Sequence, residues 1–116
     1  MKKHMTTDEA IKRWNQHAEA FTANYDEHGG VHREVLLNPA IFSLVECMDG
    51  ATILDAGCGE GYLSRILAKK GATVTSVDYS EKMLELAKRK TPSDCGIQFH
   101  HGNCEKLDFL SDGTFL

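Results

Sequence analysis

The chain has 116 residues, enough for one buried core and too few for two ordinary domains. Its 13 Lys and Arg and 17 Asp and Glu give a net charge of −4, and the basic residues are scattered, which argues against a nucleic-acid partner. No apolar run approaches the ~20 residues that cross a bilayer, so we expect a cytoplasmic protein that has no membrane partner.

The first fifty residues predict two helices. Thr6 and Glu9 fit a capping box before a helix over 8–24, whose Trp14 and Phe21 we expect in the core rather than around a substrate. Asn38 and Pro39 predict the start of a second helix with a buried face that extends through 41–48 and a stop at position 50. We expect 1–50 to form a helical cap or lid and 51–116 to form a ligand-binding half-domain.

Strands and helices alternate after residue 50. The pattern predicts a short buried strand over 51–56, a helix over 61–70, a strand over 73–77, a helix over 81–90 and a weaker strand over 97–101. This order is typical of an α/β fold with a parallel sheet and right-handed crossovers.

Three glycines at positions 57, 59 and 61 join the first of these strands to its helix. Open α/β sheets bind ligands at the carboxyl ends of their strands, and a bare loop there lets the backbone approach a ligand. Asp78 ends the second strand, where a carboxylate can accept both hydroxyls of a ribose. Asp55 lies two residues before the loop, where it would repel a pyrophosphate and suit a cationic group.

The glycine spacing is GxGxG rather than the GxGxxG of dinucleotide sites. A ligand that has an adenosine, no phosphates and a cationic amino-acid end therefore fits best, and S-adenosylmethionine is such a molecule. A dinucleotide-dependent oxidoreductase is disfavoured by the spacing and by Asp55.

The run "ILDAGCGEGYLSRILAKKGATVTSVDYSEKMLELAK" resembles the glycine motif and acidic motif of class I S-adenosylmethionine-dependent methyltransferases of the small-molecule type. The resemblance implies a Rossmann-like three-layer sandwich whose parallel sheet has seven strands. Strands one to three would be present here, and the half-domain would be truncated before the fourth. The residues that it implies in cofactor binding come from three motifs. They are Asp55, Gly57, Cys58, Gly59 and Gly61 around the methionine part, Asp78 at the ribose, and Tyr79, Asn103 and Cys104 at the adenine.

Tyr25 and Arg33 fall where similar enzymes close a lid, and either could meet the methionine carboxylate or the sulfonium. His28 and His32 could be acid-base groups, although a polar loop explains them equally well. Methyl transfer depends largely on holding donor and acceptor together, so the sequence identifies no catalytic residue.

The resemblance implies transfer of a methyl group to an unidentified small-molecule acceptor, with S-adenosylhomocysteine as product. The alternative is a non-catalytic module that binds an adenosyl ligand or assists assembly. Without a fourth strand, the first strand would have an open edge, so we expect a homodimer or a strand swap there.

Four cysteines, at positions 47, 58, 95 and 104, form no CxxC pair and favour reduced thiols in the cytosol. The alternative is a zinc site formed by Cys95, His100, His101 and Cys104, although the spacing of these residues matches no usual zinc pattern. We therefore expect no metal.

Overall fold

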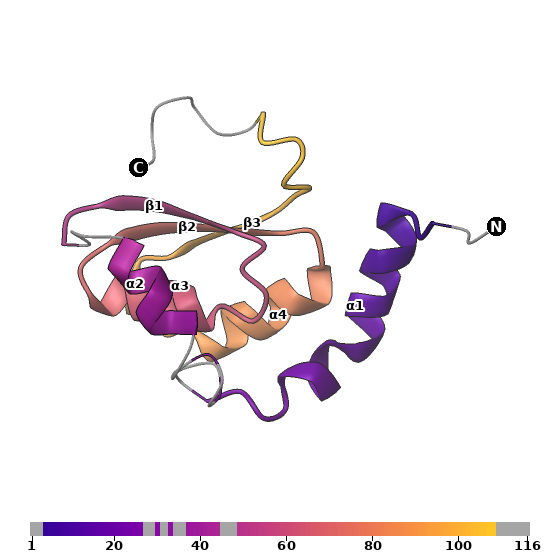
Figure 1. Cartoon of the computed structure of the whole chain (residues 1–116), viewed down its shortest axis with the longest axis horizontal. Coiled ribbons are helices and arrows are strands. Elements are labelled where there is room, and N and C mark those ends of the chain that lie inside the picture. The colour runs from indigo at the N-terminus through magenta and orange to yellow at the C-terminus, as the bar shows by residue number, and fades with distance from the viewer. Residues whose placement is uncertain (1–3, 27–29, 31–32, 34–36, 45–48, 109–116) are drawn as a thin grey trace.

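A computed structural model describes residues 4–26, 30, 33, 37–44 and 49–108 of the protein (Figure 1). Its elements follow the predicted order closely. They are α1 (Thr7–Thr22), α2 (Asn38–Leu44), β1 (Thr52–Ala56), α3 (Tyr62–Lys69), β2 (Thr73–Asp78), α4 (Glu81–Lys90), the 3-10 turn η2 (Ser93–Cys95) and β3 (Gln98–His101).

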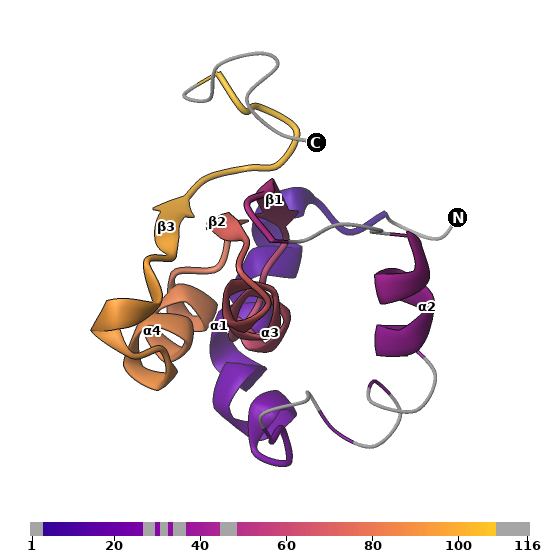
Figure 2. The ribbon, with the colours of Figure 1, turned by 90° about the vertical axis from the view of Figure 1, so that its left-hand side faces the viewer.

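The three strands form a parallel sheet in the order β1-β2-β3. The register pairs Asp55 with Ser76 and Asp78 with His101, so the carboxyl ends of the three strands lie side by side. Both crossovers run in the same direction, and α3 and α4 therefore lie on the same face of the sheet (Figures 1 and 2). The α/β prediction is confirmed, and the described residues show two of its layers, the sheet and these helices.

The sequence predicts a buried strand over 51–56, but in the structure β2 is the more buried strand. Val74 to Val77 are all buried, whereas Thr52 to Asp55 in β1 are only partly buried. The reason is position, because β2 has a strand on each side while β1 pairs with β2 alone in the described part of the chain. Leu67, Ala72 and Val74 form the core cluster between α3 and the sheet.

Helix α1 stands beyond the carboxyl ends of the strands and packs on α4 (Figure 1). The predicted capping box is confirmed by the reciprocal bonds of Thr6 and Glu9. Ala18 is fully buried against Met83 and Leu86. The N-cap of α4 is Ser80, whose hydroxyl donates a hydrogen bond to the Asn15 side-chain oxygen of α1. This bond fixes how the two helices meet.

The placement predicted for Trp14 and Phe21 is wrong, since their side chains are 42% and 49% exposed. Their rings meet edge to face with centroids 5.0 Å apart, and both side chains line a cavity together with Met83 of α4. They share one helical stripe with Ala18, so the periodicity is that of an amphipathic helix, but only Ala18 of the three is buried in the core.

Helix α2 begins at Asn38 as expected, and Phe42 packs on the cluster around Leu67. The rest of its predicted buried face, at 45–48, and His28 and His32 lie outside the described residues. None of the helices that the structure describes combines the length and apolar character needed to span a bilayer.

Candidate functional site

The glycine loop folds back onto the end of β2. Gly57, Gly59 and Gly61 have φ angles of 73°, 58° and 86°, a left-handed conformation that glycine adopts without steric penalty. The N–H groups of Gly57 and Cys58 both donate to the Val77 carbonyl, at 2.7 and 3.0 Å. A Cβ added at Gly57 or Gly59 would meet no atom within 4 Å, so this backbone is open to a ligand.

Asp78 is fixed at the carboxyl end of β2 by two backbone donors. Its Oδ2 accepts from the Gly59 N–H at 2.9 Å, and its Oδ1 accepts from the Ser80 N–H at 2.8 Å. An ionised carboxylate has about four lone-pair sites, so each oxygen retains capacity for another donor. This geometry suits a ligand that presents two adjacent hydroxyls.

Asp55 lies at the end of β1, on the other side of the loop. Its Oδ2 accepts from the Ser64 hydroxyl at 2.6 Å, and the Ser64 and Ser76 hydroxyls lie 2.7 Å apart. Burial raises the pKa of the Asp55 carboxyl, the Ser64 bond opposes that shift, and the charge of Asp78 adds to it. A cationic ligand group would favour the ionised form, because an opposite charge nearby offsets the effect of burial.

One cavity of about 610 Å³ contains both carboxylates and the open side of the loop. The structure brings eight of the nine predicted site residues to its wall. They are Asp55, Gly57, Cys58, Gly59, Asp78, Tyr79, Asn103 and Cys104. Burial raises the pKa of the Cys58 thiol, which fits a small packing residue rather than a nucleophile.

Gly61 is the predicted residue that does not line this cavity. A Cβ there would lie 3.1 Å from Arg65 Nη1 and 3.3 Å from the Ala87 Cβ. Glycine at this position therefore lets α3 and α4 approach each other behind the loop.

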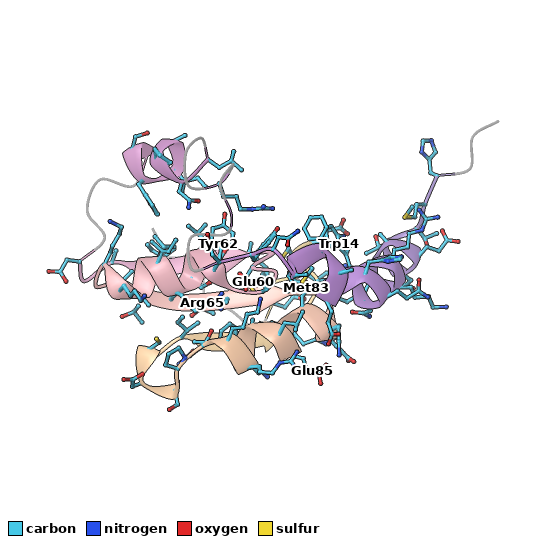
Figure 3. All side chains as sticks on the ribbon, turned by 90° about the horizontal axis from the view of Figure 1, so that it is seen from below. Trp14, Glu60, Tyr62, Arg65, Met83 and Glu85 are labelled. Atoms are coloured by element: carbon cyan, nitrogen blue, oxygen red, sulfur yellow. The ribbon has the colours of Figure 1, made fainter. Side chains whose placement is uncertain are left out.

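The far wall consists of aromatic residues that the sequence only partly identified. Trp14, Phe21 and Tyr25 line it from α1 and the segment after it, and Tyr62 lines it from the start of α3. Figure 3 shows Trp14 and Tyr62 on the same side of the molecule. Tyr62 follows the last glycine of the loop directly, and this position in the sequence could have identified it as a residue of the cavity wall.

Arg33 supplies a cation at this wall. Its guanidinium carbon lies 4.5 Å from the centroid of the Tyr25 ring and 5.7 Å from that of Tyr62. Burial raises the pKa of both tyrosines, and the charge of Arg33 opposes the shift. The two lid residues that the sequence suggested, Tyr25 and Arg33, are thus in contact and line the cavity.

The residues after β2 and β3 form the third side of the cavity. The Tyr79 ring stacks on His101 with centroids 5.7 Å apart and an interplanar angle of 10°. The Asn103 side-chain oxygen accepts from the Glu105 N–H at 2.9 Å, so this side chain, which the resemblance places at the adenine, already has one donor on its oxygen. Cys104 lies beside it and is exposed.

The described residues contain no group of three or more His, Cys, Asp or Glu side chains that could hold a metal ion. The four residues of the zinc alternative, Cys95, His100, His101 and Cys104, all lie in the described part of the chain and do not form such a group.

Comparison with known proteins gives consistent matches. Residues 53–115 match a family model described as "Methyltransferase domain". A ubiquinone biosynthesis O-methyltransferase of Hydrogenovibrio crunogenus is 34% identical over 102 residues, which cover 86% of this chain and 42% of that protein. A malonyl-[acyl-carrier protein] O-methyltransferase of Buchnera aphidicola is 37% identical over 101 residues, which cover 84% and 38%.

A crystal structure of an S-adenosylmethionine dependent methyltransferase from Mesorhizobium loti matches with a TM-score of 0.55 and 35% identity, over 59% of this chain and 32% of that one. The chain thus spans about two fifths of the length of the curated relatives that it matches.

Proposed function

This chain belongs to the methyltransferase domain family, and on that premise we propose that it binds S-adenosylmethionine for methyl transfer to a small molecule. The observation that carries the proposal is the placement of two carboxylates, Asp55 and Asp78, on either side of the open glycine loop in one cavity. A ribose and an ammonium group are the ligand parts that such a pair fits.

We assign the ligand contacts from this geometry. Asp78 would accept from the ribose hydroxyls with the lone pairs that its backbone bonds leave, and Asp55 would pair with the methionine ammonium. Arg33 lines the same cavity and would meet the methionine carboxylate, or Tyr25 would meet the sulfonium. Tyr79, Asn103 and the Cys104 N–H would surround the adenine, and the Gly57 to Gly59 backbone would lie against the ligand.

When bound, S-adenosylmethionine supplies the methyl group. The contribution of this chain is to bind and orient that donor and to exclude water around it, which is a large part of what an in-line displacement requires. The aromatic wall of Trp14, Phe21, Tyr25 and Tyr62 would shield the site from solvent. We assign no base, because one is needed only where the acceptor must lose a proton.

The acceptor is proposed as a small molecule. The two relatives described above are named O-methyltransferases, which favours an oxygen as the acceptor atom. Incubation with S-adenosylmethionine and a fractionated metabolite extract should yield S-adenosylhomocysteine, measured by mass spectrometry. If the chain binds S-adenosylhomocysteine but no fraction yields product, the non-catalytic adenosyl-binding module becomes the better proposal.

The pKa of Asp55 leads to a pH dependence of ligand binding. A raised pKa means that the carboxyl takes up its proton at a higher pH than an ordinary aspartate, and only the ionised form attracts an ammonium group. Affinity for S-adenosylhomocysteine should therefore fall as the pH is lowered through a window above the ordinary aspartate range. Asp55→Asn should bind more weakly at neutral pH and lose this dependence. Parallel pH profiles for the two proteins would contradict the assignment.

We also propose that the open edge of β1 pairs with a second copy, as a homodimer or by strand exchange. In the described part of the chain, β1 pairs with β2 alone, and an unpaired parallel edge is a template for another strand. Sedimentation should then show a dimer. A monomer at micromolar concentration with slow amide exchange at Ile53 and Leu54 would contradict it.

The proposed location is the cytoplasm. Cys58, Cys95 and Cys104 have free thiols in the structure, which is consistent with a reducing compartment.

A further inference from the structure

The glycine loop contains a buried charged residue that the ligand contacts above do not use. Glu60 is 2% exposed and is among the largest fully buried side chains of the described residues. A buried carboxylate without partners would be strongly destabilising, so its partners are part of what allows the loop to fold this way.

Two cationic side chains, those of Arg65 and Lys90, donate hydrogen bonds to the buried Glu60 carboxylate. Arg65 Nη2 donates to both carboxylate oxygens of Glu60, at 3.0 and 2.8 Å, and Lys90 Nζ donates to Oε2 at 3.0 Å. The Arg65 side chain is 12% exposed and that of Lys90 is 35% exposed. Hydrogen bonds between charged groups are about twice as strong as neutral ones, so these bonds hold the Glu60 side chain firmly.

These bonds join the loop to α3 and to the end of α4. Arg65 Nη1 also donates to the Glu60 carbonyl at 2.8 Å and to the Thr91 hydroxyl at 3.2 Å, just after α4. Figure 3 shows Glu60 and Arg65 between α3 and α4. The loop is therefore held at two places, by β2 through residues 57–59 and by α4 through Glu60.

Arg65 and Lys90 lie outside the cavity assigned to the cofactor. They line a second cavity of about 350 Å³ behind the loop, and neither reaches the wall of the first. Glu60 and Tyr25 line both cavities, and Lys90 has its hydrogen bond to Glu60, so an effect of Lys90 on ligand binding would be transmitted through Glu60.

We propose that Glu60, Arg65 and Lys90 form a clamp that holds the glycine loop in its ligand-binding shape, and that Lys90 is a positioning residue for the cofactor. The proposal rests on the proposed function for its ligand. Its physical basis is preorganisation, because a loop that is free to move must be ordered when the ligand binds, and that ordering lowers affinity.

The test compares affinities for S-adenosylhomocysteine by calorimetry, at a temperature where circular dichroism shows every variant folded. Lys90→Met should weaken binding about tenfold, which corresponds to 1.4 kcal/mol. Lys90→Arg should retain affinity, because the longer side chain keeps the charge that Glu60 requires. Lys88→Met is the matched control from the same turn of α4, and it should bind as the wild type does. Wild-type affinity in Lys90→Met would overturn the clamp.

A double-mutant cycle identifies the route. Lys90→Met in a Glu60→Gln background should have little further effect on affinity, whereas fully additive losses would show that Lys90 acts elsewhere and would overturn the proposal.

Amide exchange in the free protein gives a readout that needs no ligand. Lys90→Met should speed exchange at Gly61, whose N–H donates to the Cys58 carbonyl, and should leave Val74 in the core of β2 unchanged. Unchanged exchange at Gly61 would overturn the clamp. If the wild type does not bind S-adenosylhomocysteine, the proposed function fails, and exchange at Gly61 still decides on the clamp.

Discussion

Replacement of Asp78 by alanine should weaken binding of S-adenosylhomocysteine by about 1 to 3 kcal/mol, the range for hydrogen-bonding groups that lose their partner. The side chain would lose its bonds to the ribose, and the Gly59 and Ser80 N–H groups would lose the acceptor that now orders them. Affinity should therefore fall through both lost contacts and a less ordered loop. Calorimetric titration of the folded variant measures the loss.

Two further variants separate these causes. Asp78→Asn retains one carbonyl oxygen for a backbone donor but no charge, so its affinity should lie between those of the wild type and the alanine variant. Asp94→Ala removes an exposed carboxylate in η2, away from the cavity, and should change nothing. Full affinity in a folded Asp78→Ala protein would show that the ribose assignment is wrong.

Replacement of Gly61 by alanine should lower the free energy of unfolding by about 2 to 3 kcal/mol, as the sum of a left-handed backbone and overpacking. Its φ angle of 86° is disfavoured for alanine, and the new methyl group would lie 3.1 Å from Arg65 Nη1 and 3.3 Å from the Ala87 Cβ. Arg65 cannot move aside freely, because it is bonded to Glu60 and Thr91. Urea unfolding followed by circular dichroism measures the effect.

Gly96 offers a matched control for that substitution. Its φ angle of 71° is also left-handed, but a Cβ there would meet no atom within 4 Å. Gly96→Ala should therefore show only the backbone effect, about 1 kcal/mol. Equal losses for the two variants would mean that the close approach of α3 and α4 at Gly61 contributes nothing.

The local features of this fold could be predicted from the sequence because each depends on neighbouring residues. The capping box of Thr6 and Glu9, the N-cap at Ser80 and the strand-loop-helix unit around Gly57 are encoded within a few positions. The two carboxylates of the site could also be predicted from the sequence, because the carboxyl ends of neighbouring parallel strands lie side by side.

Features that depend on tertiary partners could not be predicted in the same way. Glu60 resembles a solvated loop residue, and its partner Lys90 lies thirty positions away at the end of another helix. Trp14 and Phe21 have the spacing of core residues, but they line a cavity, and periodicity does not distinguish a residue that packs in the core from one that faces a cavity. The burial of β1 relative to β2 depends on strand order rather than composition.

The most direct test of this account is a calorimetric titration of the wild-type chain with S-adenosylhomocysteine and, separately, with NAD. We expect one molecule of S-adenosylhomocysteine to bind per chain and NAD to show no heat of binding, because Asp55 beside the glycine loop disfavours a pyrophosphate and favours an ammonium group. Binding of NAD in preference to S-adenosylhomocysteine would contradict the account.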